Sequence, residues 1–170
     1  MEKESKISHG VAENAFITAL ELFGLMRVLD YFQVQDYVSD FGMIGLSYGG
    51  FYTLFMAAVD TRVKAAVSCA FFSNRKDYAW SDWTWFDAEN KFSDAEIACL
   101  VYPRKLCIEV GSKDDLFDIR SAREEIKRLK EMGSHQKADW LEVIEFDGGH
   151  EFCLEDSPIE KLVKEITDDL

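Results

Sequence analysis

The chain is poor in positive charge and in long apolar runs, and both absences narrow what it can bind. It has 19 lysine and arginine residues against 32 aspartate and glutamate residues, a formal net charge of -13 at pH 7. This charge argues against nucleic acid, whose recognition needs clustered basic side chains, and against anionic membrane surfaces. No apolar stretch approaches the roughly 20 residues of a membrane span, and the polar residues 1–6 lead into no signal-like segment. We therefore expect a cytoplasmic protein with no nucleic-acid or membrane partner.

Cysteine pairs and prolines are also scarce. The four cysteines have no C-x-x-C spacing and no histidine at ligand spacing, which predicts free thiols and no metal site at Cys69, Cys99, Cys107 and Cys153. Only two prolines occur, and no repeat or low-complexity tract marks a linker. With 170 residues, 48% of them hydrophobic, the chain suits one domain over residues 1–170.

Alternating strand and helix patterns predict an α/β fold. Apolar runs at residues 41–46, 61–67, 105–110 and 140–146 are typical of buried strands, and helical patterns separate them. This order predicts a parallel sheet of about four strands joined by right-handed crossovers. Helix starts are predicted at Ser93 and Ser121 from capping boxes, and at Ser157 from the proline that follows it. A helical period over Val11–Phe32 predicts one buried face, made of Ala12, Ala15, Phe16, Ala19, Phe23, Met26 and Leu29.

The most informative motif is the G-x-S-x-G sequence Gly45-Leu46-Ser47-Tyr48-Gly49, which follows the first strand and precedes the helical stretch 52–59. A serine in this position is typical of a nucleophile elbow, a turn so sharp that glycine is expected two residues on either side. The start of the helix would face an anion forming at Ser47, and the backbone N–H of Tyr48 is the expected oxyanion donor. A simple glycine-rich turn at a strand end is the structural alternative.

Candidates for an acid and a base follow the last two strands, in the order nucleophile, acid, histidine. The third strand ends in a turn with Asp114 and Asp115, and the fourth ends in Asp147-Gly148-Gly149-His150. His150 is the predicted base, because only an imidazole has an unperturbed pKa near 7. One of the two aspartates would orient it while the other caps the turn. The other histidines, His9 and His135, lie in polar segments and are expected to be exposed.

Together the elbow, the turn at 111–115 and Gly148-Gly149-His150-Glu151-Phe152 resemble the C-terminal half of an α/β-hydrolase, a likeness that covers nearly the whole chain. The nearest resemblance is to acetyl-xylan-esterase-like and dienelactone-hydrolase-like proteins. It implies an ester hydrolase that cleaves small acyl esters without a cofactor. In such families the acid usually lies three residues after the turn glycine, which favours Asp114 over Asp115. Dienelactone hydrolases carry a cysteine nucleophile, so Ser47 favours an ester hydrolase.

Two other functions stay open from the residues. The Ser-Tyr-Gly-Gly sequence at 47–50 also resembles serine peptidases of the prolyl-oligopeptidase type. Alternatively, the chain is a truncated hydrolase that serves as a binding or structural module without catalysis.

The resemblance also exposes a gap, because the resembled fold has several strands before its nucleophile strand. About forty residues precede Phe41, and they contain no convincing strand. We therefore expect a truncated sheet that lacks the loop giving the second oxyanion donor. Strand 41–46 becomes an apolar sheet edge, which predicts a homodimer paired along it. A monomer would result if residues 1–11 folded over that edge instead.

Three of the four tryptophans, Trp80, Trp83 and Trp85, fall within the segment 78–86 after the second strand. Such density predicts a wall or lid of a substrate pocket, or equally a satellite cluster that covers the sheet.

Overall fold

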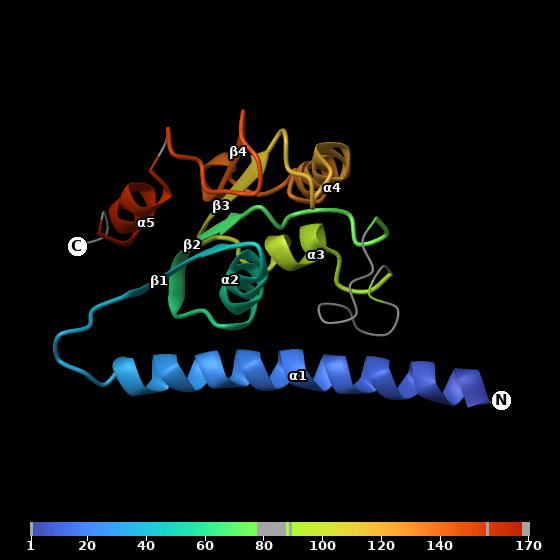
Figure 1. The fold of residues 1–170 in the computed structure, drawn as a ribbon. Helices are drawn as coiled ribbons and strands as arrows, with labels where there is room; N and C mark the ends of the chain where they lie inside the picture. The colour runs from blue at the N-terminus through green and yellow to red at the C-terminus, as the bar shows by residue number, and fades with distance from the viewer. Residues whose placement is uncertain (1, 78–87, 89, 156, 168–170) are drawn as a thin grey trace.

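The fold is a parallel sheet with helices on both faces (Figure 1). The computed structural model describes residues 2–77, 88, 90–155 and 157–167. In chain order the elements are α1 (Glu2–Phe32), β1 (Phe41–Leu46), α2 (Tyr48–Val59), β2 (Val63–Cys69), α3 (Asp94–Cys99), β3 (Lys105–Gly111), α4 (Ile119–Met132), the 3-10 turn η1 (Ala138–Trp140), β4 (Leu141–Phe146) and α5 (Pro158–Thr167). The predicted order of helices and strands is confirmed.

The sheet has four strands in the order β1-β2-β3-β4, and every neighbouring pair is parallel. The predicted four-stranded parallel sheet is therefore confirmed. Because all strands run the same way, the loops after β1, β2, β3 and β4 meet at one edge of the sheet. These loops carry Ser47, the segment from Ala70, Asp114 and His150 respectively.

Side chains alternate between two apolar layers, as the period of a strand requires. Ala65, Val67 and Cys107 point to one face, where Leu162 of α5 covers them. Ala66, Leu106, Ile108 and Val110 point to the other face, where they pack with residues of α2, α3 and α4. The central strands β2 and β3 are thus buried, and α5 packs against β1 and β2 on one face of the sheet.

Helix α1 contacts α2, which lies between α1 and the sheet in Figure 1. The predicted buried face of this helix is partly wrong. Ala19 and Phe23 are exposed, while Leu29 is buried and Met26 half-buried, and the inner face also includes Thr18, Leu22 and Leu25. The predicted helix is present, but apolar residues occur on both of its faces. The sequence period alone therefore could not tell which of them, such as Phe23, point outward. Ile17, Leu20 and Tyr31 are among its exposed side chains.

An arginine fastens the carboxyl end of α1 to the turn between α2 and β2. The Arg62 guanidinium donates to Asp30 Oδ1 at 2.6 Å, to Asp60 Oδ2 at 2.5 Å and to the carbonyl oxygen of Met26 at 3.3 Å. The hydrogen bonds from the Arg62 side chain to Asp60 chiefly hold the pKa of the Asp60 carboxyl below its ordinary value. Arg62 therefore ties the carboxyl end of α1 to the body of the domain.

Two predicted helix starts are confirmed and one is wrong. Ser93 forms the capping box with Glu96, and α5 begins at Pro158 after Ser157. Helix α4 begins three residues earlier than predicted, because Asp118 caps it by accepting from Arg120 N. Ser121 instead lies buried inside the helix. Its hydroxyl pairs with the Ser73 hydroxyl at 2.8 Å, so a tertiary contact explains the serine.

The β1 edge stays uncovered in the part of the chain that the structure describes, where β1 pairs with β2 alone. Residues 2–11 continue α1, and its amino-terminal end lies away from β1 (Figure 1), so the alternative to the dimer, in which this segment folds over the edge, is wrong. The four cysteines are free thiols, as predicted. Among the described helices, none is both long and apolar enough to cross a bilayer. The tryptophan segment 78–86 lies outside the described residues.

Candidate active site

Ser47 sits in a strained turn between β1 and α2. Its backbone angles are φ 58° and ψ -119°, a region that side-chain-bearing residues rarely adopt. Strain of this kind costs about 1–3 kcal/mol and is concentrated at functional sites. The Ser47 side chain makes no capping hydrogen bond to α2, so its hydroxyl is not committed to the helix. The geometry is that of the predicted elbow.

The glycines around Ser47 play unequal parts. A Cβ atom at Gly45 would lie 2.1 Å from the carbonyl oxygen of Gly49, and one at Gly50 would lie 2.7 Å from that of Cys69. A Cβ at Gly49 would meet nothing within 4 Å. The expectation of a glycine requirement on both sides of the serine is therefore right at Gly45 and wrong at Gly49. The second tight contact falls at Gly50, where α2 crosses the end of β2.

Of the two candidate acids, Asp114 is the one whose carboxylate contacts His150. Asp114 Oδ2 lies 2.9 Å from His150 Nδ1, and the Asp114 side chain is only 2% exposed. Asp114 Oδ1 accepts from the backbone N–H groups of Leu116 at 2.8 Å and Phe117 at 3.1 Å. One carboxylate thus both caps the turn and meets the imidazole, so the expected division of these tasks between the two aspartates is wrong. Asp115 is exposed.

His150 is held in place by the loop after β4, which crosses the end of β3. Gly148 O accepts from Lys113 N at 2.8 Å, and a Cβ at Gly111 would lie 2.2 Å from Gly149 O. The ring of Phe117 stacks on the imidazole, with centroids 5.9 Å apart and planes 13° from parallel. His150 keeps 24% of its side chain exposed. His135 is exposed, as predicted, and the side chain of His9 lies outside the described part.

Two hydrogen bonds through Cys69 connect the serine turn with the histidine loop. The carbonyl oxygen of Cys69 accepts from Ser47 N at 2.9 Å. The Cys69 thiol donates to the carbonyl oxygen of Glu151 at 3.1 Å, and Glu151 directly follows His150 in the chain. Ser47 and His150 are therefore both fastened to the carboxyl end of β2. The sequence offered no signal for this link, since a cysteine at a strand end is also a common core residue.

Helix α1 reaches the first turn of α2 through Glu21. The Tyr48 hydroxyl donates to the Glu21 carboxylate at 3.1 Å and lies 2.8 Å from the Tyr52 hydroxyl, which also donates to Glu21. Burial chiefly, with the hydrogen bond to Glu21 next, raises the pKa of Tyr52. The side chain that follows the serine is thereby fixed, a contact that sequence patterns did not reveal.

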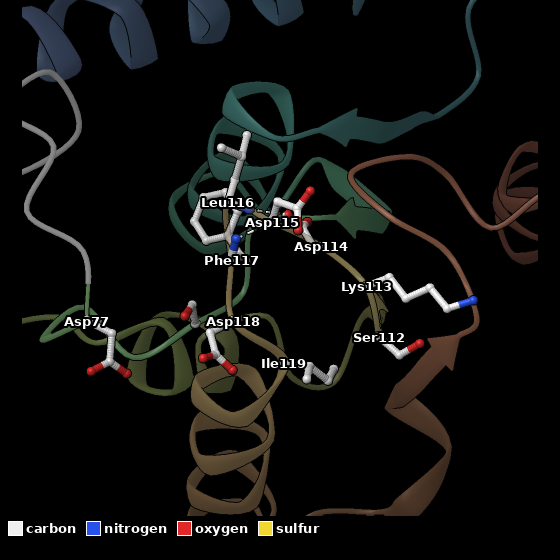
Figure 2. A pocket seen from close by; sticks show the side chains of 10 residues that line it. Asp77, Ser112, Lys113, Asp114, Asp115, Leu116, Phe117, Asp118 and Ile119 are labelled. Carbon is white, nitrogen blue, oxygen red and sulfur yellow. Dashed lines mark hydrogen bonds between the residues drawn. The ribbon is translucent and has the colours of Figure 1, made fainter.

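A pocket of about 490 Å³ lies beside the acid turn. Its lining runs from Ser112 to Ile119 and includes Ser73 and Asp77, without Ser47 or His150. Figure 2 shows Asp114 and Asp115 together at one end of it, while Lys113 points away. The Lys113 ammonium pairs with Asp147 at 2.7 Å. Among the described residues, no group of histidine, cysteine and acidic side chains could hold a metal ion.

Comparison with solved structures places the fold. A CE15 esterase from a marine bacterial metagenome matches 86% of this chain with a TM-score of 0.63 at 15% identity. A glucuronoyl esterase from Solibacter usitatus matches 85% with a TM-score of 0.62 at 16% identity, and methylesterase BT1017 matches 88% with a TM-score of 0.68 at 16% identity. The fold is that of part of an α/β-hydrolase. No protein-family model and no curated protein sequence matches the chain.

The α/β-hydrolase fold found here is partial. The chain spans 47% of the length of the first two structures and 35% of the third. The expected truncated α/β-hydrolase fold is confirmed. At these identities the likeness establishes the fold and no more.

Proposed function

We propose that the protein is a serine hydrolase of the carboxylesterase type that cleaves small acyl esters. Ser47 is the nucleophile, His150 the base and Asp114 the acid that orients it. The observation that carries the proposal is the 2.9 Å contact of His150 Nδ1 with a buried carboxylate, in a loop fastened to the same strand end as the strained Ser47 turn. The solved structures of similar fold named above are esterases, which supports the same chemistry.

The roles follow from the two nitrogens of the imidazole. With Nδ1–H donated to Asp114, Nε2 carries a lone pair and takes the Ser47 proton. The serine oxygen then forms a bond to the acyl carbon, and the carbonyl becomes an oxyanion. His150 passes its proton to the leaving alcohol as the ester C–O bond breaks. Water, deprotonated by His150, hydrolyses the acyl-enzyme and restores the serine.

The oxyanion needs donors, and Tyr48 supplies one from its backbone N–H. Tyr48 is the first residue of α2, where N–H groups make no bond within the helix itself. The second donor of the superfamily comes from a loop after an earlier strand. Loss of one donor typically costs about 100- to 1,000-fold in rate, so full turnover needs a second donor beside Tyr48.

The test compares the hydrolysis of p-nitrophenyl acetate by the wild-type chain and by Ser47→Ala. We expect the wild type to exceed the variant by about 10³-fold or more, since removal of the nucleophile leaves only residual catalysis. We also expect faster cleavage of the acetate ester than of long-acyl esters or prolyl amides. Equal rates in the two proteins would refute nucleophilic catalysis and favour a binding module. A preference for prolyl amides would favour a peptidase.

A further inference from the structure

We propose that Glu109, a buried carboxylate in the middle of the sheet, is a positioning residue that holds the His150 loop in its working geometry. The proposal rests on the function proposed above. Glu109 lies in β3, two residues before the end of the strand, and its side chain is fully buried. It belongs to neither the catalytic triad nor the acid turn.

The carboxylate reaches the histidine loop directly. Glu109 Oε2 accepts from the backbone N–H of Cys153 at 3.2 Å, three residues after His150. That N–H is buried, so the carboxylate replaces water as its acceptor. Cys153 itself is 3% exposed, which places this end of the loop inside the domain.

A second contact comes from the neighbouring strand. Cys69 of β2 and Glu109 of β3 are register partners, so their side chains lie on the same face of the sheet. The Cys69 thiol donates to the carbonyl oxygen of Glu151 at 3.1 Å. Burial chiefly, followed by the charge of Glu109, raises the pKa of Cys69, which keeps the thiol protonated and able to donate. Cys69 and Glu109 thus hold the loop at Glu151 and Cys153, one and three residues after His150.

The residue type at this position argues for a task beyond stability. The Glu109 side chain lies on the face of β3 that carries the buried Cys107, opposite to Leu106, Ile108 and Val110, and an apolar residue at 109 would avoid the cost of burying a carboxylate. Replacement of a buried charged group by an apolar one of similar volume is often neutral or stabilising. The free-energy cost of burying the Glu109 carboxylate is therefore explained if its hydrogen bond to the loop fixes the position of His150.

The experiment uses Glu109→Leu, Glu109→Gln and a matched control. Glu125→Leu also removes a carboxylate that is 2% exposed and accepts from a backbone N–H, that of Ala95 at 2.9 Å, but it lies on α4 in contact with α3. The readout is the low-field imidazole Nδ1–H resonance of His150 in the 170-residue chain, assigned by its loss in His150→Gln. Hydrolysis of p-nitrophenyl acetate is measured alongside.

We expect the His150 resonance to broaden or shift in Glu109→Leu and to stay in place in Glu109→Gln, whose amide oxygen can still accept from Cys153. Glu125→Leu should leave it unchanged. The kcat of Glu109→Leu should fall about 10- to 100-fold with KM within about twofold, as expected for a displaced base. An unchanged resonance in folded Glu109→Leu overturns the positioning role. A wild type without esterase activity whose resonance still responds to Glu109→Leu refutes the proposed function and leaves the positioning role supported.

Discussion

Replacement of Asp114 by asparagine separates its two tasks, because each of its oxygens serves a different group. Oδ1 accepts from two backbone N–H groups of the turn, and Oδ2 meets His150 Nδ1. In Asp114→Asn the amide oxygen can keep the turn bonds while the amide NH₂ faces the imidazole. Nδ1 must then accept, which places the ring proton on Nε2, where it blocks proton transfer from Ser47. The comparable change in a serine protease lowers kcat about 10⁴-fold.

Asp114→Ala removes both tasks, and the magnitudes can be worked out from the contacts. Two hydrogen bonds to a charged acceptor are lost from a side chain that is 2% exposed. At about 1–2 kcal/mol each, the free energy of unfolding should fall by about 2–4 kcal/mol. Asp114→Asn should lose less than about 1 kcal/mol, although both variants lose activity.

The assays are urea unfolding and the kcat for p-nitrophenyl acetate, with Asp115→Asn as the matched control. Asp115 is exposed, so its substitution should change stability by no more than about 0.5 kcal/mol and leave kcat within about twofold. The reasoning is refuted if Asp114→Asn keeps kcat within tenfold of the wild type. It is equally refuted if Asp115→Asn is the variant that loses activity.

Three further predictions concern the turn, the α1 anchor and the sheet edge. Gly45→Ala should abolish esterase activity, because the added Cβ would lie 2.1 Å from the Gly49 carbonyl oxygen. Gly49→Ala should fold normally, because its Cβ would meet nothing within 4 Å. Equal circular dichroism spectra and equal kcat in the two variants would contradict this prediction. Asp60 has a pKa held below its ordinary 3.8 chiefly by hydrogen bonds from Arg62, so its contribution of about 1–3 kcal/mol is present above pH 3.8 and lost below it. Unfolding measured against Asp60→Asn should show the difference shrink below that pH, and a constant difference would count against it. We also propose that two copies of the chain pair along β1 (Phe41–Leu46). Light scattering at micromolar concentration should then give twice the 19.5 kDa mass of the monomer. A strict monomer whose β1 amides are weakly protected from hydrogen exchange would show that β1 needs no second copy.

Most helices and strands could be predicted from the sequence, because their periods, like the glycine-serine motif, depend only on residues close together in the chain. Parallel order follows from the alternation of strands and helices, which brings Ser47, Asp114 and His150 to one sheet edge. Facts that depend on distant contacts were not predictable. Ser121 fits a capping box in sequence, yet its hydroxyl meets Ser73 across the fold.

The same limit applies to the site. The link from Cys69 to Glu151 joins residues 82 positions apart, and the bond from Glu109 to Cys153 joins residues 44 positions apart. The double role of Asp114 depends on the path of the turn, which spacing alone does not specify. Phe23 shows the converse case, a residue on the correct helical period that faces outward because the helix packs through Leu22 and Leu25 instead.

The central claim, that His150 activates Ser47 as a nucleophile, is tested most directly by covalent labelling with a fluorophosphonate and peptide mass mapping. The account predicts one adduct per chain, located on Ser47 and absent in Ser47→Ala. Labelling should slow by at least about 100-fold in His150→Gln, because the base contributes about 10²- to 10⁴-fold. Labelling of another residue, or labelling of Ser47 at the same rate in His150→Gln, would contradict the claim.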